Sequence, residues 1–261
     1  SLAISSRQEE SYMSILMKGA DVAKTMKEDL TGEARRLKDR GILPSLTIVR
    51  VGARPDDLAY ERGARKRMEM IGIECKVVEL PETITQAEFE KTFFKINEDP
   101  KVHGILLFRP LPGHLDEGPV VSRINPLKDV DCMCPVNIAK VFSGDPTGFA
   151  PCTPEAVIEV LKAYNIPMEG KRAVIVGRSM VVGRPLSMLL LKENATVTIC
   201  HTRTKDLPGT CQQAEILVAA AGKAKMLDDS YVGENTTVID VGINVDENGK
   251  LCGDAAADTL E

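Results

Sequence analysis

The chain lacks the features that mark two large classes of protein. No stretch approaches the ~18 uncharged apolar residues that a membrane-spanning helix needs, so no membrane partner is expected. There is also no long basic run, and the formal net charge is −5. These properties argue against nucleic acid as the main partner.

Paired cysteines are absent as well. The seven cysteines are odd in number and scattered, at positions 75, 132, 134, 152, 200, 211 and 252. The spacing of Cys132 and Cys134 is not that of a zinc site, and neither His103 nor His114 has a metal-ligand partner nearby in the sequence. The sequence therefore predicts free thiols in a reducing cytoplasm and no bound metal.

The composition is that of a folded protein. Hydrophobic residues make up 43% of the chain and charged residues 27%, so a packed core is expected. At about 150 residues per domain, the chain suggests one large domain or two modest ones. The first dozen residues, SLAISSRQEESY, are polar and are interpreted as a tag remnant, outside the fold.

Strands alternate with helices along most of the chain. Expected strands cover residues 44–52, 75–80, 102–108, 171–177, 195–201, 214–222 and 236–243. A helix-like pattern runs from Met13 to Gly41, and further helices are expected over residues 58–72, 85–99, 154–165 and 185–194. Asp56 or Asp57 is expected to cap the second helix and Gly72 to end it, and we place a domain hinge near Pro151. The alternation predicts an α/β fold with a parallel sheet.

One glycine-containing turn predicts a phosphate cradle. In RAVIVGRSMVVGRPLSMLL a strand leads into Gly177, five residues follow, and Gly183 opens a helix. Glycine lets the backbone approach a ligand closely, and a helix N-terminus favours anions. The spacing is not G-x-G-x-x-G, so on spacing alone an ordinary strand-to-helix turn is an equal alternative.

The end of the next strand bears on the choice of cofactor. A free ribose 2′-hydroxyl usually meets an acidic residue there, whereas this strand ends in CHTRT. Thr202 and Arg203, together with Arg178, would suit a 2′-phosphate. This favours NADP and leaves NAD open; the alternative is that Arg203 is a solvated surface arginine.

Seven segments occur in the order and at the spacing of one known family. They are VGARPDDLAYERGARKRMEMIGI, PLPGHLDE, NPLKDVD, PCTP, VGRSMVVGRP, ATVTICHTRT and VIDVGIN. Through them, residues 14–254 resemble the methylenetetrahydrofolate dehydrogenase/methenyltetrahydrofolate cyclohydrolase (FolD-type) family. The resemblance implies a homodimer of chains with two α/β domains around a cleft, the second a Rossmann-like parallel-sheet dinucleotide-binding domain. The expected boundaries are 13–150 for the folate-binding catalytic domain and 151–261 for the NAD(P)-binding domain.

The resemblance also implies an activity and a site. Members oxidise 5,10-methylenetetrahydrofolate to 5,10-methenyltetrahydrofolate by hydride transfer, and most then hydrolyse the product to 10-formyltetrahydrofolate. The expected catalytic residues are Tyr60, which would stack on the folate, and Asp131, whose carboxylate would accept N–H donors from the pterin. The other site residues carried over are Phe108, Pro110 and Pro112 for folate, and Gly177, Arg178, Ser179, Gly183, Thr202, Arg203 and Ile243 for the cofactor.

Two positions depart from the family pattern. Ala64 stands where the family has a lysine four residues after the tyrosine, and Phe108 stands where it has a glutamine. A lysine of lowered pKa can assist hydrolysis and alanine cannot, whereas hydride transfer needs mainly correct positioning. We therefore expect a dehydrogenase whose cyclohydrolase activity has been lost.

Two alternatives stay open. The first is a bifunctional enzyme with a displaced base, for which Lys66 or Arg67 would be the candidates. The second is a non-catalytic folate or nucleotide binder, which the intact Tyr60, Asp131 and glycine turn disfavour.

Overall fold

The computed structural model describes residues 2–4, 15–17, 19–245, 248 and 251–256. The chain divides into two compact units, each named here after its main sheet. The three-stranded unit contains residues 23–141 and 145–150. The six-stranded unit contains the described parts of residues 1–22, together with residues 142–144 and the described parts of residues 151–261.

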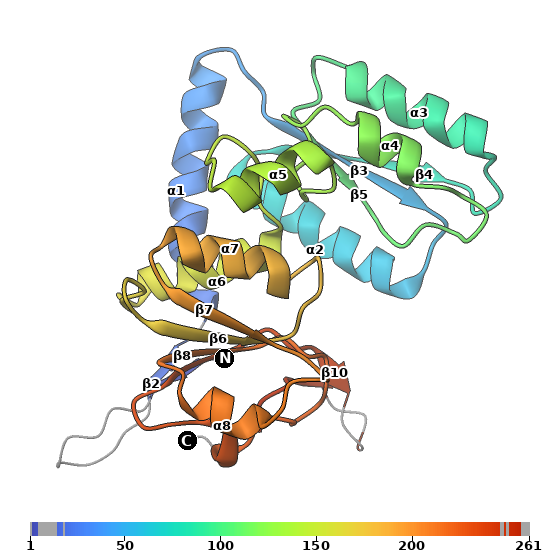
Figure 1. Ribbon diagram of the computed structural model, residues 1–261. Coiled ribbons are helices and arrows are strands. Elements are labelled where there is room, and N and C mark those ends of the chain that lie inside the picture. The colour runs from blue at the N-terminus through green and yellow to red at the C-terminus, as the bar shows by residue number, and fades with distance from the viewer. Residues whose placement is uncertain (1, 5–14, 18, 246–247, 249–250, 257–261) are drawn as a thin grey trace. The chain divides into compact units, whose positions relative to one another are not determined.

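The three-stranded unit is built on a parallel sheet of order β4-β3-β5. The strands are β3 (Ser45–Val51), β4 (Glu74–Leu80) and β5 (Gly104–Leu107). The helices are α1 (Gly19–Asp39), which begins in the other unit, α2 (Pro55–Ile71), α3 (Gln86–Glu98), α4 (Gly118–Arg123) and α5 (Pro135–Ser143), which ends there. In Figure 1, α2 lies on one face of this sheet and α3 and α4 lie on the other. The expected strands and helices of this half are confirmed to within a few residues at their ends, with one exception: the first helix begins at Gly19 and not at Met13, because Ile15–Met17 pair as a strand.

The ends of α2 show how the local sequence sets its position. Pro55 occupies the first helical turn, where its fixed φ suits a helix and its missing N–H is not needed. Asp56 and Asp57 lie in that same first turn, so the expectation that one of them caps the helix is wrong; the capping position is Arg54, which makes no side-chain cap. Gly72 ends the helix in the left-handed conformation (φ +83°), as expected.

A buried ion pair fixes α2 against the sheet. Arg50 Nε of β3 lies 2.6 Å from Glu61 Oε2 of α2, and both side chains are less than a tenth exposed. Arg50 also pairs with Glu79 at 2.9 Å and donates to the carbonyl of Gly52. Because a buried charge without a partner is costly, this pair holds the face of α2 that follows Tyr60 at a defined distance from β3.

The six-stranded unit has the strand order β2-β1-β9-β8-β6-β7. Four strands are parallel: β6 (Arg172–Val176), β7 (Thr196–Cys200), β8 (Ile216–Ala219) and β9 (Thr237–Asp240). Its other elements are α6 (Cys152–Ala163), α7 (Gly183–Lys192), α8 (Leu207–Gln212), the short η1 (Asp229–Tyr231), and the antiparallel pair β10 (Asn244–Val245) and β11 (Leu251–Cys252). Figure 1 shows α6 and α7 on one face of the sheet and α8 on the other, so this unit is doubly wound, as expected.

The amino-terminal strands differ from the expected domain boundaries. Strand β1 (Leu2–Ile4) pairs antiparallel with β9, and β2 (Ile15–Met17) pairs antiparallel with β1. Met17 is fully buried in the same cluster as Leu161 and Leu190. The described residues up to Val22 therefore belong with the six-stranded unit, because backbone pairing and the burial of Met17 outweigh closeness in sequence to the first half. The tag interpretation covers residues 1–12; residue 1 and residues 5–12 lie outside the described part, whereas Leu2–Ile4 form β1.

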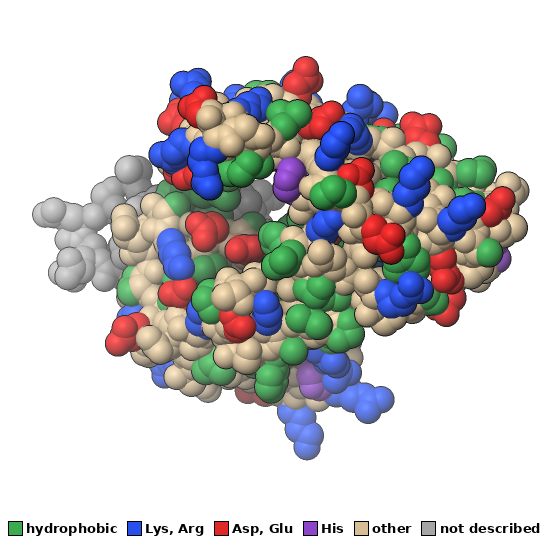
Figure 2. Space-filling model, turned by 90° about the horizontal axis from the view of Figure 1, so that it is seen from above, with side chains coloured by type: hydrophobic (Ala, Val, Ile, Leu, Met, Phe, Trp, Pro, Cys, Tyr) green, Lys and Arg blue, Asp and Glu red, His purple; other side chains and the backbone are tan. Residues whose placement is uncertain are grey.

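The face of the molecule in Figure 2 shows no large patch of one charge sign among its described residues. Lys and Arg side chains are interspersed with Asp and Glu on the described residues of the face in Figure 2. Within the described ranges, no helix is long and apolar enough to cross a membrane. No group of three metal-ligating side chains forms a cluster in those same ranges.

Candidate active site

Two aromatic side chains from different elements meet in the three-stranded unit. Tyr60 lies in the second turn of α2, and Phe108 directly follows β5. Their ring centroids are 5.5 Å apart and the rings are inclined at 75°, an edge-to-face pair. Phe108 is buried, whereas Tyr60 is 59% exposed. The pair therefore presents a fixed, accessible tyrosine ring on a buried support.

The two predicted prolines line a cavity in the same unit. Pro110 and Pro112 line a space of about 280 Å³ with residues 51–54 and Glu82. The Arg109–Pro110 peptide bond is cis. Arg54 Nη2 donates to the carbonyl of Pro110 at 3.1 Å, which ties the start of α2 to the loop after β5. We call this space the proline cavity.

The two aspartates of KDVDC have different surroundings. Asp129 is fully buried and accepts from the backbone N–H groups of Met133 and Cys134, at 2.9 Å each, and from Asn137 Nδ2 at 3.0 Å. Asp129 thus organises the turn into α5. Asp131, in contrast, is only partly buried.

Arg109 adds a positive charge close to both aspartates. Its guanidinium bonds to Glu117, with Nε 2.8 Å from Oε2, and this bond is the main reason that the pKa of Arg109 is raised. Asp131 and Asp129 raise it further by their charge. In return, Arg109 holds the pKa of Glu117 below its usual range.

The position one turn after Tyr60 carries no titratable group. Ala64 is partly buried there, and Arg65, Lys66 and Arg67, which follow it on α2, are exposed. Around the Tyr60–Phe108 pair, positions 64 and 108 offer only a methyl group and a phenyl ring. These two side chains can position a ligand but cannot transfer a proton.

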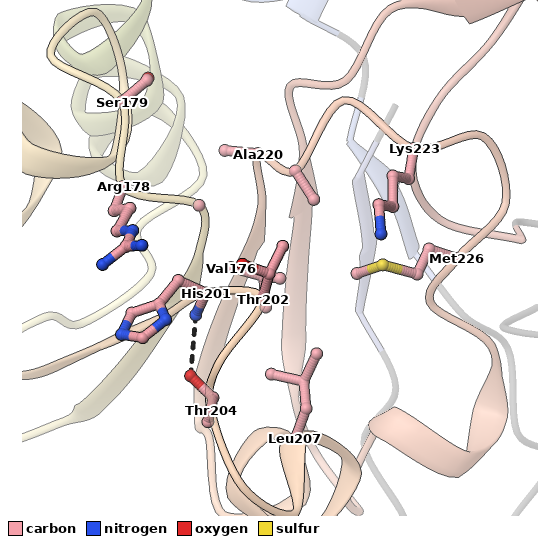
Figure 3. A pocket seen from close by; sticks show the side chains of 12 residues that line it. Val176, Arg178, Ser179, His201, Thr202, Thr204, Leu207, Ala220, Lys223 and Met226 are labelled. Carbon is pink, nitrogen blue, oxygen red and sulfur yellow. Dashed lines mark hydrogen bonds between the residues drawn. The ribbon is translucent and has the colours of Figure 1, made fainter.

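A larger cavity lies in the six-stranded unit, at the carboxyl ends of three adjacent strands. It encloses about 410 Å³. Its walls come from the end of β6, the loops after β6, β7 and β8, and the start of α8. The lining residues are Val176, Gly177, Arg178, Ser179, His201, Thr202, Thr204, Leu207, Ala220, Ala221, Lys223 and Met226 (Figure 3). Ligands of open parallel sheets bind at this edge. We call it the strand-end cavity.

Two glycines allow the loop at this cavity to fold. Gly177 has φ +137°, and a Cβ there would lie 2.2 Å from the carbonyl oxygen of Ala220. A Cβ on Gly183 would lie 2.0 Å from the carbonyl oxygen of Gly177. The Ser179 hydroxyl accepts from Val182 N at 3.0 Å, just before α7 begins. Backbone packed this closely beside a helix N-terminus is the arrangement that admits a phosphate, so the residues present fit a dinucleotide.

The structure does not bring every predicted cofactor residue to this cavity. Gly177, Arg178, Ser179 and Thr202 line it, whereas Gly183, Arg203 and Ile243 do not. Arg203 is exposed and its backbone N–H donates to His201 Nδ1 at 3.1 Å. Ile243 follows β9 and is 84% exposed.

Lys223 lines the strand-end cavity but was not predicted from the sequence. It follows β8, which was predicted only as a strand. Its nearness to Gly177 depends on the strand order β8-β6-β7. The only available signal was its place just past a strand that neighbours the glycine turn in a doubly wound sheet.

Comparison with known families agrees with the two units. Residues 17–131 match the family model described as "Tetrahydrofolate dehydrogenase/cyclohydrolase, catalytic domain". Residues 151–261 match "Tetrahydrofolate dehydrogenase/cyclohydrolase, NAD(P)-binding domain". The strand-end cavity thus lies in the part of the chain that matches the NAD(P)-binding domain.

Individual proteins are similar over nearly the whole chain. The "Bifunctional protein FolD" of Clostridium kluyveri is 56% identical over 242 residues, which cover 93% of this chain and 85% of that protein. Among solved structures, the bifunctional FolD of Campylobacter jejuni is 40% identical with a TM-score of 0.91, covering 94% of this chain and 87% of that one. A Trypanosoma brucei FolD solved with NADP and an inhibitor is 33% identical, with a TM-score of 0.86, and covers 94% and 86%.

Proposed function

Because the chain belongs to the tetrahydrofolate dehydrogenase/cyclohydrolase family, we propose that it oxidises 5,10-methylenetetrahydrofolate to 5,10-methenyltetrahydrofolate by hydride transfer to NADP. The observation that carries the proposal is the strand-end cavity. The loop beside it has no room for a Cβ at Gly177 or Gly183. The described residues that line the cavity include basic side chains and no acidic one. That combination suits a dinucleotide with a 2′-phosphate better than one with a free 2′-hydroxyl.

In this proposal the folate binds to the three-stranded unit. Tyr60 stacks on the pterin, and the buried Phe108 keeps the tyrosine ring from rotating away. Asp131 accepts hydrogen bonds from the amino-pyrimidine edge. Pro110 and Pro112 form the rigid wall of the proline cavity.

The cofactor residues act by binding and orientation. The backbone at Gly177 and the start of α7 at Gly183 receive the phosphates, and Arg178, Ser179 and Thr202 add donors along the wall. When bound, NADP supplies the nicotinamide that accepts the hydride. Arg203 and Ile243 remain proposed cofactor residues, with a role at the edge of the site, because they lie outside the cavity wall.

Hydrolysis of the methenyl product in the same site is the second candidate function. The similar proteins of known name are called bifunctional, and this favours a chain with both activities over the expected dehydrogenase-only enzyme. The side chains at positions 64 and 108 argue the other way, since neither can act as a general base. In a bifunctional chain, water itself or a basic residue further along α2 would have to take the proton.

Two absorbance assays on one enzyme sample separate these functions. The first follows NADPH formation from methylenetetrahydrofolate and NADP, which we expect to depend on the enzyme. The second follows the loss of methenyltetrahydrofolate in the absence of NADP. Enzyme-dependent hydrolysis supports the bifunctional candidate, its absence supports the dehydrogenase-only one, and failure of the first assay would rule out the main proposal.

We further propose that the protein is a cytoplasmic homodimer. The resemblance to the family supports the dimer. The seven cysteines are free, which is what a reducing compartment produces. Light scattering of the purified protein tests the dimer, which predicts twice the 28.4 kDa mass of the chain.

A further inference from the structure

The charges around the strand-end cavity come from two walls. Arg178 and His201 extend from the loops after β6 and β7, and Lys223 extends from the loop after β8. In Figure 3, Arg178 and Lys223 stand on opposite sides of the space. No acidic side chain is among the described residues that line the cavity, so its walls favour an anion.

Lys223 differs from other lysines of the same unit in its surroundings. Lys162 pairs with Glu193 at 2.7 Å and Lys171 pairs with Glu215 at 3.0 Å. Within the described part of the chain, the ammonium of Lys223 enters no ion pair. A cation that lines a cavity without an acidic partner is available to a bound anion.

The backbone of Lys223 is held by one buried carboxylate. Asp254 is fully buried, and it accepts from three successive backbone N–H groups: Ala221 at 2.6 Å, Gly222 at 2.9 Å and Lys223 at 2.9 Å. It also accepts from Asn244 Nδ2 at 2.8 Å.

Hydrogen bonds to an ionised acceptor are roughly twice as strong as neutral ones. The loop that presents Lys223 to the cavity therefore has a fixed geometry, although its tip is exposed.

We propose that Lys223 binds a phosphate group of NADP and that Asp254 positions it. The inference rests on the proposed use of NADP. Arg178 and Lys223 then contact the cofactor from opposite walls, and Asp254 acts only through the loop that it anchors. Unlike Arg203, which is proposed to act at the edge of the site, Lys223 lines the cavity itself.

Equilibrium binding of NADPH, followed by its fluorescence without any folate, tests the first part. We expect Lys223→Gln to weaken binding about tenfold, the loss of one charge-assisted contact of about 1.4 kcal/mol. Lys225→Gln is the matched control, because Lys225 lies two residues away and outside the cavity wall; its binding should equal that of the wild type. A Lys223→Gln protein that binds NADPH as tightly as the wild type would overturn the proposal.

Competition with NADPH by two smaller nucleotides identifies the phosphate. If Lys223 contacts the 2′-phosphate, Lys223→Gln weakens 2′,5′-ADP and leaves 5′-ADP unchanged. If it contacts the diphosphate, 5′-ADP is weakened as well. A variant that binds both nucleotides as the wild type does contradicts the assignment.

Combining substitutions tests the positioning role of Asp254. We expect Asp254→Asn to weaken NADPH binding, and Lys223→Gln to have a smaller effect in that background than in the wild type, since the two act through one contact. Fully additive effects would contradict this role. These binding measurements need no turnover, so a wild-type protein that binds NADPH but does not oxidise methylenetetrahydrofolate would refute the proposed function and leave this inference standing.

Discussion

Tyr60 of α2 and Phe108 after β5 form an edge-to-face pair whose ring centroids are 5.5 Å apart. The pair joins an exposed ring to a buried one. It also places the position where the family has a glutamine in direct contact with the proposed folate-stacking ring. A phenyl ring at position 108 thus supports Tyr60 by packing, whereas a glutamine would offer a hydrogen bond.

Removing either ring should affect stability and folate binding differently. We expect Phe108→Ala to lower the free energy of unfolding by about 3 kcal/mol, because it empties a buried site. Tyr60→Ala should cost less than about 1 kcal/mol, because the ring is mostly exposed, yet raise the KM for methylenetetrahydrofolate about tenfold.

Urea denaturation of both single variants and the double variant gives the coupling between the rings, expected at about 0.5–1.5 kcal/mol. A coupling of zero would mean that the packing does not stabilise the tyrosine.

Substituting Gly177 should close the strand-end cavity. In Gly177→Ala the new Cβ meets the carbonyl oxygen of Ala220 at 2.2 Å, so the loop must shift, and NADPH binding should become undetectable. Gly170→Ala is the control: its φ is also positive, +72°, but no atom lies within 4 Å of the new Cβ. We expect it to cost about 1 kcal/mol of stability with NADPH affinity unchanged. Equal losses of affinity in both variants would show that backbone strain, and not the cavity, is responsible.

Restoring the family's two polar side chains should promote hydrolysis. We expect Ala64→Lys combined with Phe108→Gln to raise the rate of methenyltetrahydrofolate hydrolysis about 100-fold, the usual contribution of a positioned acid or base. Ala59→Lys places the same amine on an exposed position of α2 and should leave the rate unchanged. A double variant that still oxidises methylenetetrahydrofolate but hydrolyses no faster would show that hydrolysis does not depend on these positions.

The buried thiol of Cys211 should lower the free energy of unfolding at alkaline pH. Burial, helped by the neighbouring Cys200, raises the pKa of Cys211 from 9.0 to about 12. Between these values the unfolded chain has lost the proton and the folded chain keeps it, so folding stability decreases as pH rises.

Below pH about 9 both states hold the proton and the thiol adds no slope. Above pH about 9, we therefore expect the free energy of unfolding of Cys211→Ala to fall less steeply with pH than that of the wild type. The two slopes should differ by up to about 1.4 kcal/mol per pH unit. Parallel stability curves would contradict the raised pKa.

The sequence predicted most of the elements because their signals are local. The strand at residues 45–51 is a run of β-branched and apolar residues, and the turn at Gly72 needs the left-handed conformation that glycine adopts most easily. The short helices α4, α5 and α8 were not predicted, because six to nine residues give too few turns for a periodic pattern. The pairing of β1 with β9 was also missed, because it joins residues more than 230 positions apart.

In the candidate site, too, the residues set by a local pattern were predicted, whereas those brought together by the tertiary fold were not. Gly177 and Gly183 were predicted from a pattern contained in one stretch of sequence, and both prove necessary for the backbone there. Lys223 and its anchor Asp254 were not, because their nearness to the glycine turn follows from strand order and from a hydrogen-bonded loop 31 residues away in sequence. Arg203 was predicted from its neighbours in sequence; it is not among the described residues that line the cavity, and its contact with the cofactor stays a prediction.

The most direct test of the central claim follows the hydride itself. Methylenetetrahydrofolate carrying deuterium on the methylene carbon is incubated with the protein and NADP, and the NADPH formed is examined by mass spectrometry. Hydride transfer predicts NADPH that carries a single deuterium, formed only in the presence of the protein. Unlabelled NADPH, or none above the protein-free control, would contradict the account.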